Sequence, residues 1–179
     1  ATDKADHILT QIEDMVRENQ QAIGLAHTAT ELWQLKQEGK KGLMMGIENG
    51  YAIGKDLSLL QHFRDRGIVY LTLCHNGDND ICDSAKGENE HGGLSDFGYE
   101  VVKEMNDLGI VIDLSHASEK SFYDVLATSR VPVVCSHSSS RSLCDVPRNL
   151  TDEQMKALAE KGGVAQVTLY NGFLKKEGQ

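Results

Sequence analysis

The sequence lacks the features that define several large classes of protein. No apolar run approaches the roughly 20 residues that a membrane-spanning helix needs, and no cluster of Lys and Arg exceeds three residues. The 27 acidic residues outnumber the 18 basic ones, which gives a net charge of −9. Nucleic acids and anionic membrane surfaces are recognised through basic surface patches. We therefore expect no nucleic acid partner, and nothing in this segment indicates membrane association.

Cysteine is scarce, and its spacing fits neither a metal site nor a disulfide framework. The four cysteines form no C-x-x-C pair and show no zinc-ribbon spacing. Four cysteines among 179 residues are far fewer than a disulfide scaffold contains. We expect free or buried thiols at Cys74, Cys82, Cys135 and Cys144, and the compartment stays open.

Three short enzyme signatures are also missing. The chain has no G-x-G-x-x-G, no P-loop and no G-x-S-x-G, so dinucleotide binding, P-loop phosphate binding and a serine nucleophile all lose their main support. The overall composition is ordinary, with 40% hydrophobic residues and 17 glycines, which excludes disordered and low-complexity chains. A length of 179 residues suits one domain.

What the sequence does contain is a regular alternation of apolar strands and amphipathic helices. Such strands, with a helix in every gap, are typical of a parallel sheet covered on both faces. At roughly 28 residues per unit, eight units would need about 225 residues, near the usual size of a (β/α)8 TIM barrel. We predict one α/β domain over residues 1–179, a central barrel fragment of about six βα units without the first and last strands. The six strands are expected near residues 22–26, 43–47, 68–73, 110–114, 132–135 and 164–168.

Polar caps and glycines set the expected limits of the helices. A first helix over 5–19 is predicted to place Ile8, Ile12, Met15 and Val16 on its buried face. Each later helix begins at a side chain that can accept a hydrogen bond from the first turn. These predicted caps are Thr28, Asp56, Ser95, Ser118 and Thr151, and a long loop is expected over 74–93.

Four chemically active side chains follow the C-terminal ends of four successive predicted strands. Glu48 comes directly after the strand at 43–47, and His75, His116 and His137 each lie two residues beyond one of the next three strands. In a barrel these strand ends meet at one mouth, where active sites are found. Taken singly, each histidine is more often an ordinary hydrogen-bonded residue. Four such placements in succession indicate a site.

Glu48, His116 and His137 match the chemistry of a catalytic zinc site, which has about three protein ligands and one position open for water. Polar residues flank both histidines and are available to fix the imidazole tautomers by hydrogen bonds. They are Asp113, Ser115, Ser136, Ser138 and Ser139. The serine run at 138–140 fits a polar turn equally well.

The same residues carry a family resemblance over nearly the whole chain. The segments GIENG (46–50), LTLCHN (71–76), GLSDFGYEVVKEMNDLGIVIDLSHAS (93–118), PVVCSHSSS (132–140) and PRNLTDE (147–153) closely resemble the membrane (renal) dipeptidase family of zinc peptidases. Five ordered motifs make the resemblance specific. One departure is Asn49, which stands where the family often has glycine.

The resemblance implies a (β/α)8 barrel of the metal-dependent hydrolase type, with two zinc ions bridged by Glu48. His116 and His137 resemble the ligands of the second zinc, and His75 resembles the histidine that faces the substrate and stabilises the tetrahedral intermediate. Arg148 resembles the arginine that binds the terminal carboxylate of a dipeptide. The implied reaction is hydrolysis of dipeptides by a metal-bridging hydroxide. Tyr170 and Phe173 would line the pocket or, with equal support, pack in the core.

Two features of the family are absent from the chain. The first zinc needs an H-x-D motif, which occurs nowhere here, and the proton-handling aspartate of the last strand would lie beyond Gln179. These are the two strands that the barrel arithmetic also leaves out. We therefore expect only structural roles for His7, His27 and His62, and His91 stays unassigned.

Two other interpretations remain open from the sequence. One is another amidohydrolase-type barrel acting on cyclic amides, lactones or esters, although Glu48 stands where such enzymes have a bridging lysine. The other is a catalytically silent fragment. Because an incomplete barrel has open edges, we also expect this chain to be unstable alone or to pair with another copy.

Overall fold

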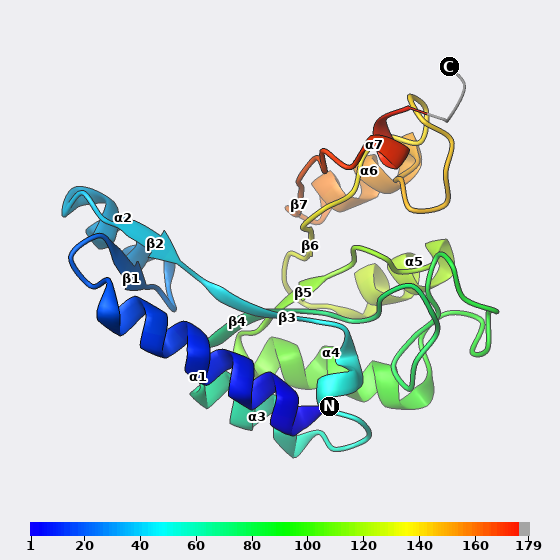
Figure 1. The fold of residues 1–179 in the computed structure, drawn as a ribbon. Coiled ribbons are helices and arrows are strands. Elements are labelled where there is room, and N and C mark those ends of the chain that lie inside the picture. The colour runs from blue at the N-terminus through cyan, green and yellow to red at the C-terminus, as the bar shows by residue number, and fades with distance from the viewer. Residues whose placement is uncertain (176–179) are drawn as a thin grey trace.

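The computed structural model describes residues 1–175, which contain two parallel sheets. Within each sheet, neighbouring strands are consecutive in the chain. Strands β1 (Ile23–Leu25) and β2 (Lys41–Leu43) make a short pair. The main sheet has the order β3 (Met45–Glu48), β4 (Ile68–Thr72), β5 (Val111–Asp113), β6 (Val134–Cys135) and β7 (Val164–Ala165), and every pairing is parallel. This succession of parallel neighbours confirms the predicted α/β fold and matches part of a barrel (Figure 1).

Helices α3 to α6 lie on the outer side of the main sheet, and each packs against the next one along the chain (Figure 1). In the main sheet, one helix precedes each strand from β4 to β7, which is the βα alternation expected of a barrel. The helices are α1 (Thr2–Glu18), α2 (Ala29–Gln37), α3 (Ser58–Asp65), α4 (Asp96–Leu108), α5 (Glu119–Thr128), α6 (Asp152–Glu160) and α7 (Asn171–Leu174), with a 3-10 turn η1 (Gly50–Ala52).

The hydrophobic core lies between the sheet and these helices. Phe63 of α3, Met105 of α4 and Phe122 of α5 are fully buried against apolar strand residues such as Leu71 and Ile112. Each buried side chain of this size stabilises the fold by about 1.5–3 kcal/mol. Fewer elements cover the opposite, concave face of the sheet (Figure 1). The chemically active side chains predicted from the sequence follow the C-terminal ends of its strands.

The predicted strand over 43–47 is wrong in one respect: it is two strands. Met44 separates β2 from β3, so that β2 pairs with β1 whereas β3 pairs with β4. The apolar sequence runs through both strands and gives no sign of the break. The last two strands are also shorter than predicted, since only 134–135 and 164–165 form ladder pairs.

The first helix buries only part of the predicted apolar face. Leu9 and Val16 are buried, whereas Ile8 and Met15 are 43% and 39% exposed. Leu9 and Val16 lie seven residues apart and so face the same direction. Ile8 instead lines an open groove between α1 and β3, together with Ile12. The apolar face of the helix is therefore wider than the part of it that packs against the rest of the described residues.

Local signals gave four of the other helix starts correctly. Thr28, Ser95, Ser118 and Thr151 each accept a hydrogen bond at an N-terminus, and Thr151 forms a capping box with Gln154. The prediction for Asp56 is wrong: the N-cap of α3 is Leu57, without a side-chain capping bond, and Asp56 Oδ1 instead accepts a hydrogen bond from the backbone N–H of Ser58 at 2.9 Å. All four cysteines are free and buried, as expected. Among the described residues, no helix is both long and apolar enough to cross a membrane.

Candidate metal centre

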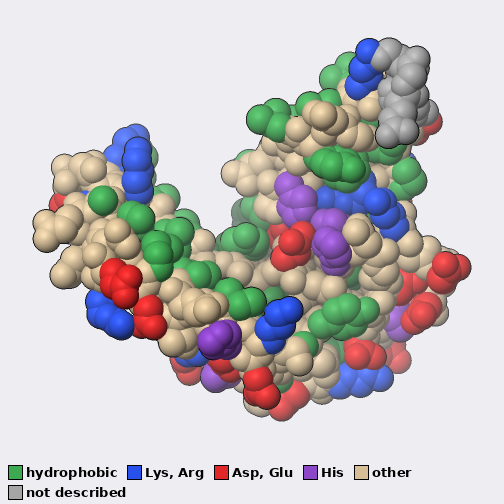
Figure 2. Space-filling view, in the orientation of Figure 1, with side chains coloured by type: hydrophobic (Ala, Val, Ile, Leu, Met, Phe, Trp, Pro, Cys, Tyr) green, Lys and Arg blue, Asp and Glu red, His purple; other side chains and the backbone are tan. Residues whose placement is uncertain are grey.

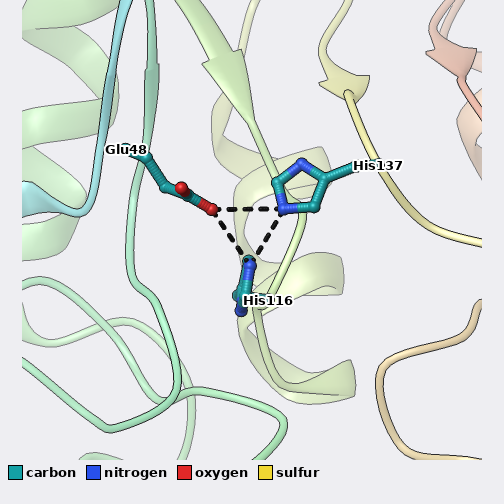
Figure 3. Close-up of side chains that lie close together, drawn as sticks. All are labelled: Glu48, His116 and His137. Atoms are coloured by element: carbon teal, nitrogen blue, oxygen red, sulfur yellow. Dashed lines mark hydrogen bonds and ion pairs between the residues drawn. The ribbon is translucent and has the colours of Figure 1, made fainter. Parts of the chain in front are cut away.

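Three of the predicted ligand residues meet at the C-terminal ends of three neighbouring strands. Glu48 ends β3, while His116 and His137 follow β5 and β6. Glu48 Oε1 lies 3.1 Å from His116 Nε2 and 3.2 Å from His137 Nε2, and the two Nε2 atoms are 2.9 Å apart (Figure 3). Among residues 1–175 this is the one group of three His, Cys, Asp or Glu side chains that converges in this way.

The spacing of the three atoms suits a small divalent cation. Ligand atoms of a tetrahedral zinc site lie about 3.3 Å apart when each bond is about 2.05 Å long, close to the separations of the triad. Two imidazole nitrogens and one carboxylate oxygen are also the donors that zinc accepts. The donor set therefore fits a small divalent metal ion.

The backbone at two positions is turned to aim these side chains. His116 has φ +74° and Asn49, directly after Glu48, has φ +82°, both in the region that L-residues rarely adopt. Asn49 is held there because its side-chain oxygen accepts a hydrogen bond from Asn79 Nδ2 at 3.0 Å. Such strain is stored where the surrounding structure fixes a functional group.

A chain of hydrogen bonds fixes the tautomer of His137. Ser136 Oγ lies 2.5 Å from Asp113 Oδ2 and 2.7 Å from His137 Nδ1. Asp113 is fully buried, which alone would raise its pKa, but hydrogen bonds from Ser136, Thr72 and Ser115 outweigh burial and lower that pKa below its usual value. An ionised Asp113 only accepts, so Ser136 donates to it and His137 Nδ1–H donates to Ser136. His137 Nε2 is left with a free lone pair directed at the triad.

His116 is held neutral by a different route. Burial lowers its pKa to about 3, assisted by the charges of Arg148, His75 and His137. Its Nδ1 is buried and has no hydrogen-bond partner among the described residues. A neutral imidazole is the form that binds a metal ion. With the proton of His116 on Nδ1, its Nε2 lone pair meets those of His137 and Glu48, an arrangement that a cation stabilises.

His75 and Arg148 lie beside the triad in one cavity of about 310 Å³, which Tyr170 and Phe173 also line. The His75 ring is 4.4 Å from the His116 ring, measured between centroids. Figure 2 shows histidine, acidic and basic side chains gathered in the hollow of the concave face.

Arg148 is buried without an acidic partner in the described chain. Its guanidinium donates to the carbonyl of His137 at 3.0 Å and to Ser138 Oγ at 3.3 Å, and it lies 5.1 Å from the ring centroid of Phe173. Its Nε is buried and unpartnered. Burial lowers the pKa of Arg148, but an arginine keeps its charge at neutral pH. The cavity therefore contains a fixed positive charge that forms no direct ion pair with a carboxylate of residues 1–175.

Comparison with known proteins decides the family. The sequence profile of the membrane dipeptidases, peptidase family M19, matches residues 2–179. The chain belongs to this family. Dipeptidase verJ of Clonostachys rogersoniana is 35% identical over 166 residues, which are 92% of this chain and 42% of that protein.

Solved structures of similar proteins agree in fold. The probable dipeptidase PvdM of Pseudomonas aeruginosa matches 98% of this chain with a TM-score of 0.93 and 35% identity, over 46% of its own chain. A metallo peptidase of Rhodobacter sphaeroides, liganded with a phosphinate mimic of the dipeptide L-Ala-D-Ala, matches 96% of this chain and 49% of its own at TM-score 0.86 and 30% identity. The chain thus spans about half the length of these M19 relatives.

The remaining histidines lie outside the cavity beside the triad. His62 bonds Asp6 between α3 and α1, His27 pairs with Glu31, and His91 bonds the carbonyl of Asn79. These contacts agree with the structural roles predicted for His27 and His62, and they give His91 a role in its loop. For His7 we note only that it lies on α1.

Two residues near the site, Lys86 and Asn79, were not predicted from the sequence. Lys86 lines the cavity from the long loop, and Asn79 supports Asn49. The other site residues were predicted because they follow the ends of strands, and neither Lys86 nor Asn79 does so. Asp113 was expected beside His116, its neighbour in sequence, but it acts on His137 through Ser136. The contact of Asp113 with this segment therefore could not be read from its position next to His116 in the sequence.

Proposed function

We propose that the complete protein is a zinc-dependent dipeptidase. The observation that carries this proposal is the pairing, in one cavity, of a convergent Glu48–His116–His137 triad with the unneutralised Arg148. The triad suits a Lewis-acid metal, and a buried guanidinium suits a substrate carboxylate. Membership of the M19 family supports the same conclusion.

In this proposal Glu48, His116 and His137 hold zinc, and Glu48 bridges to a second ion. Bound zinc would supply Lewis acidity and lower the pKa of water from 15.7 to about 7. Asp113 and Ser136 keep His137 in the tautomer that can bind the metal. Glu48 is the one member of the triad that would contact this second ion.

The other side chains would bind and orient the dipeptide. Arg148 would hold its terminal carboxylate through charge-assisted hydrogen bonds, which fixes one end of the substrate. His75 would face the scissile carbonyl and donate a hydrogen bond as negative charge develops on that oxygen. A cavity of about 310 Å³ with a cation at its end favours dipeptides over longer chains.

Two substitutions in the complete gene product test these roles separately. Glu48→Gln keeps the shape of the side chain but removes the charge that attracts the cations, so zinc content and hydrolysis of Ala-Ala should both collapse. Arg148→Ala should leave zinc content intact and raise KM roughly 10- to 100-fold, the size of a lost charged hydrogen bond. Zinc is measured by mass spectrometry and hydrolysis by release of free alanine.

Glu100→Gln is the matched control, because Glu100 is exposed on α4 and far along the chain from the site. It should retain both zinc and activity. If Glu48→Gln kept full zinc and near-normal hydrolysis, the bridging assignment would be wrong and the two histidines would need another explanation.

A further inference from the structure

A second cavity, of about 400 Å³, adjoins the metal centre. Four residues line both cavities: Lys86, Arg148, Tyr170 and Phe173. The second cavity extends away from the triad between the long loop and the segment that leads to α7. A ligand held by Arg148 therefore has space on two sides of that residue.

Every charged side chain that lines this second cavity is basic. Lys86, Arg148 and Lys175 contribute to the wall, and no Asp or Glu of the described chain does. This concentration of positive charge contrasts with the net charge of −9. Figure 2 shows basic side chains directly beside the histidines and bordered by hydrophobic surface.

Lys86 is available for a ligand because it has no ion-pair partner among residues 1–175. Lys55 is paired with Asp80 at 3.1 Å, whereas Lys103 on α4 is exposed and, like Lys86, has no ion pair among the described residues. The position of Lys86 beside the cavity therefore distinguishes it, not the lack of a partner. The backbone of Lys86 is nevertheless fixed, since its N–H donates to Ser84 Oγ at 3.2 Å. Its loop thus presents an unneutralised ammonium group beside the cavity.

We propose that this second cavity is a specificity subsite for an acidic side chain on the C-terminal residue of the dipeptide. The inference rests on the proposed function, in which Arg148 binds the terminal carboxylate. The side chain on that same residue would then enter the adjoining cavity. Val146 and Pro147 offer apolar surface to its methylene groups, and Lys86, with Lys175, offers charge to its carboxylate. The preferred substrates are therefore dipeptides that end in Glu or Asp.

The test compares Ala-Glu with Ala-Gln, two dipeptides of the same shape that differ in charge. In the zinc-loaded complete gene product, kcat/KM for Ala-Glu should exceed that for Ala-Gln about fivefold, the upper range for an exposed ion pair. Lys86→Met should bring this ratio close to one, and Lys86→Arg should preserve most of it. Lys103→Met is the matched control, because Lys103 is an exposed residue of α4, and it should leave the ratio unchanged.

The possible outcomes separate the subsite from the proposed function. Cleavage of both dipeptides at equal rates, or an unchanged ratio in Lys86→Met, overturns the subsite alone. If the zinc-loaded protein cleaves neither dipeptide, the proposed function fails and the subsite fails with it. A ratio that disappears in Lys86→Met and survives in Lys86→Arg supports both.

Discussion

At the scale of single residues, the candidate metal centre depends on side chains outside the triad. Asp113 is buried and accepts hydrogen bonds from Ser136, Thr72 and Ser115, which lie on or directly after three different strands. It therefore fixes the relative positions of β4, β5 and the segment after β6 at the mouth of the site. Through Ser136 it also fixes which nitrogen of His137 carries the proton.

Ser136→Ala tests the role of this chain of hydrogen bonds. Without the hydroxyl, His137 Nδ1–H loses its acceptor and the ring can change tautomer or rotate. We expect zinc affinity to fall roughly 10- to 100-fold, the usual effect of removing a partner of a metal-binding imidazole. Competition with a chromophoric chelator measures the affinity, and long-range ¹H–¹⁵N NMR of the zinc-free protein reports the tautomer directly.

Ser142→Ala is the control for this substitution, because Ser142 is exposed in the same loop and bonds only Ser140. It should change neither zinc affinity nor the NMR spectrum of His137. Retention of the Nδ1–H tautomer and of full affinity in Ser136→Ala would show that Ser136 has no positioning role.

The residues of the triad and the Ser136 partner of His137 could be predicted from the sequence, but the link from Asp113 through Ser136 to His137 could not. Glu48, His116 and His137 were marked because each follows an apolar strand, and parallel strands bring such positions together. The direction of the His116 side chain depends on the turn of its own backbone, where φ is +74°. No local sequence pattern predicts a histidine with a positive φ angle.

At the scale of elements, the long loop between β4 and α4 is organised by two aspartates. Asp78 accepts hydrogen bonds from the backbone N–H groups of Ser84 and Glu88 at 2.6 and 2.7 Å. Asp83, which is fully buried, accepts from His91 and Gly93. Gly87 has no room for a side chain, because a Cβ there would lie 1.6 Å from Asp78 Oδ1. The loop is therefore an ordered wall for the cavity.

Asp78→Ala should loosen this loop and leave the barrel strands intact. Hydrogen exchange at the amides of Ser84, Glu88 and Glu90 should accelerate, and the protein should lose about 1–3 kcal/mol of stability, the cost of leaving such donors unsatisfied. Exchange measured by NMR or mass spectrometry tests this, with Asp80→Ala as control because Asp80 is exposed in the same loop. Unchanged exchange at these amides would contradict the role of Asp78.

The same contact predicts a dependence on pH. Desolvation would raise the pKa of Asp78, but the backbone hydrogen bonds from Ser84, Glu90 and Glu88 lower it below its usual value of 3.8. A carboxyl whose folded pKa is depressed contributes stability above its unfolded pKa and loses it as pH falls through the folded value. Protection of these amides should therefore persist at pH 5 and diminish below pH 3.8 in wild type, and show no such step in Asp78→Ala.

Helix starts were predictable at this scale because a cap is a contact within four residues. Thr28, Ser95, Ser118 and Thr151 all accept the bonds that their sequence context indicates. The break at Met44 was not predicted, and the buried face of α1 was predicted only in part, since both depend on partners distant in sequence. β2 pairs with β1, whereas β3 pairs with β4.

At the scale of the whole molecule, residues 1–175 leave the concave face of the sheet uncovered (Figure 1). Val111 and Val164 of this sheet are 39% and 54% exposed, and Val167 and Leu169, just after β7, are 70% and 82% exposed. The barrel fold was predictable because βα alternation is regular, and the site lies on this face because strand ends converge there. An apolar surface of this kind favours association with another protein surface.

We therefore expect residues 1–179, produced alone, to self-associate or to melt without a cooperative transition. Two edges of the sheet and its apolar face are then accessible to a second copy. Sedimentation velocity and thermal unfolding followed by circular dichroism measure this directly. The double substitution Val167→Glu and Leu169→Glu places charge on the exposed face, so it should reduce association, whereas Val167→Leu with Leu169→Val should not. A monodisperse wild-type monomer that melts cooperatively would show that this face needs no covering, and the predicted instability would then be wrong.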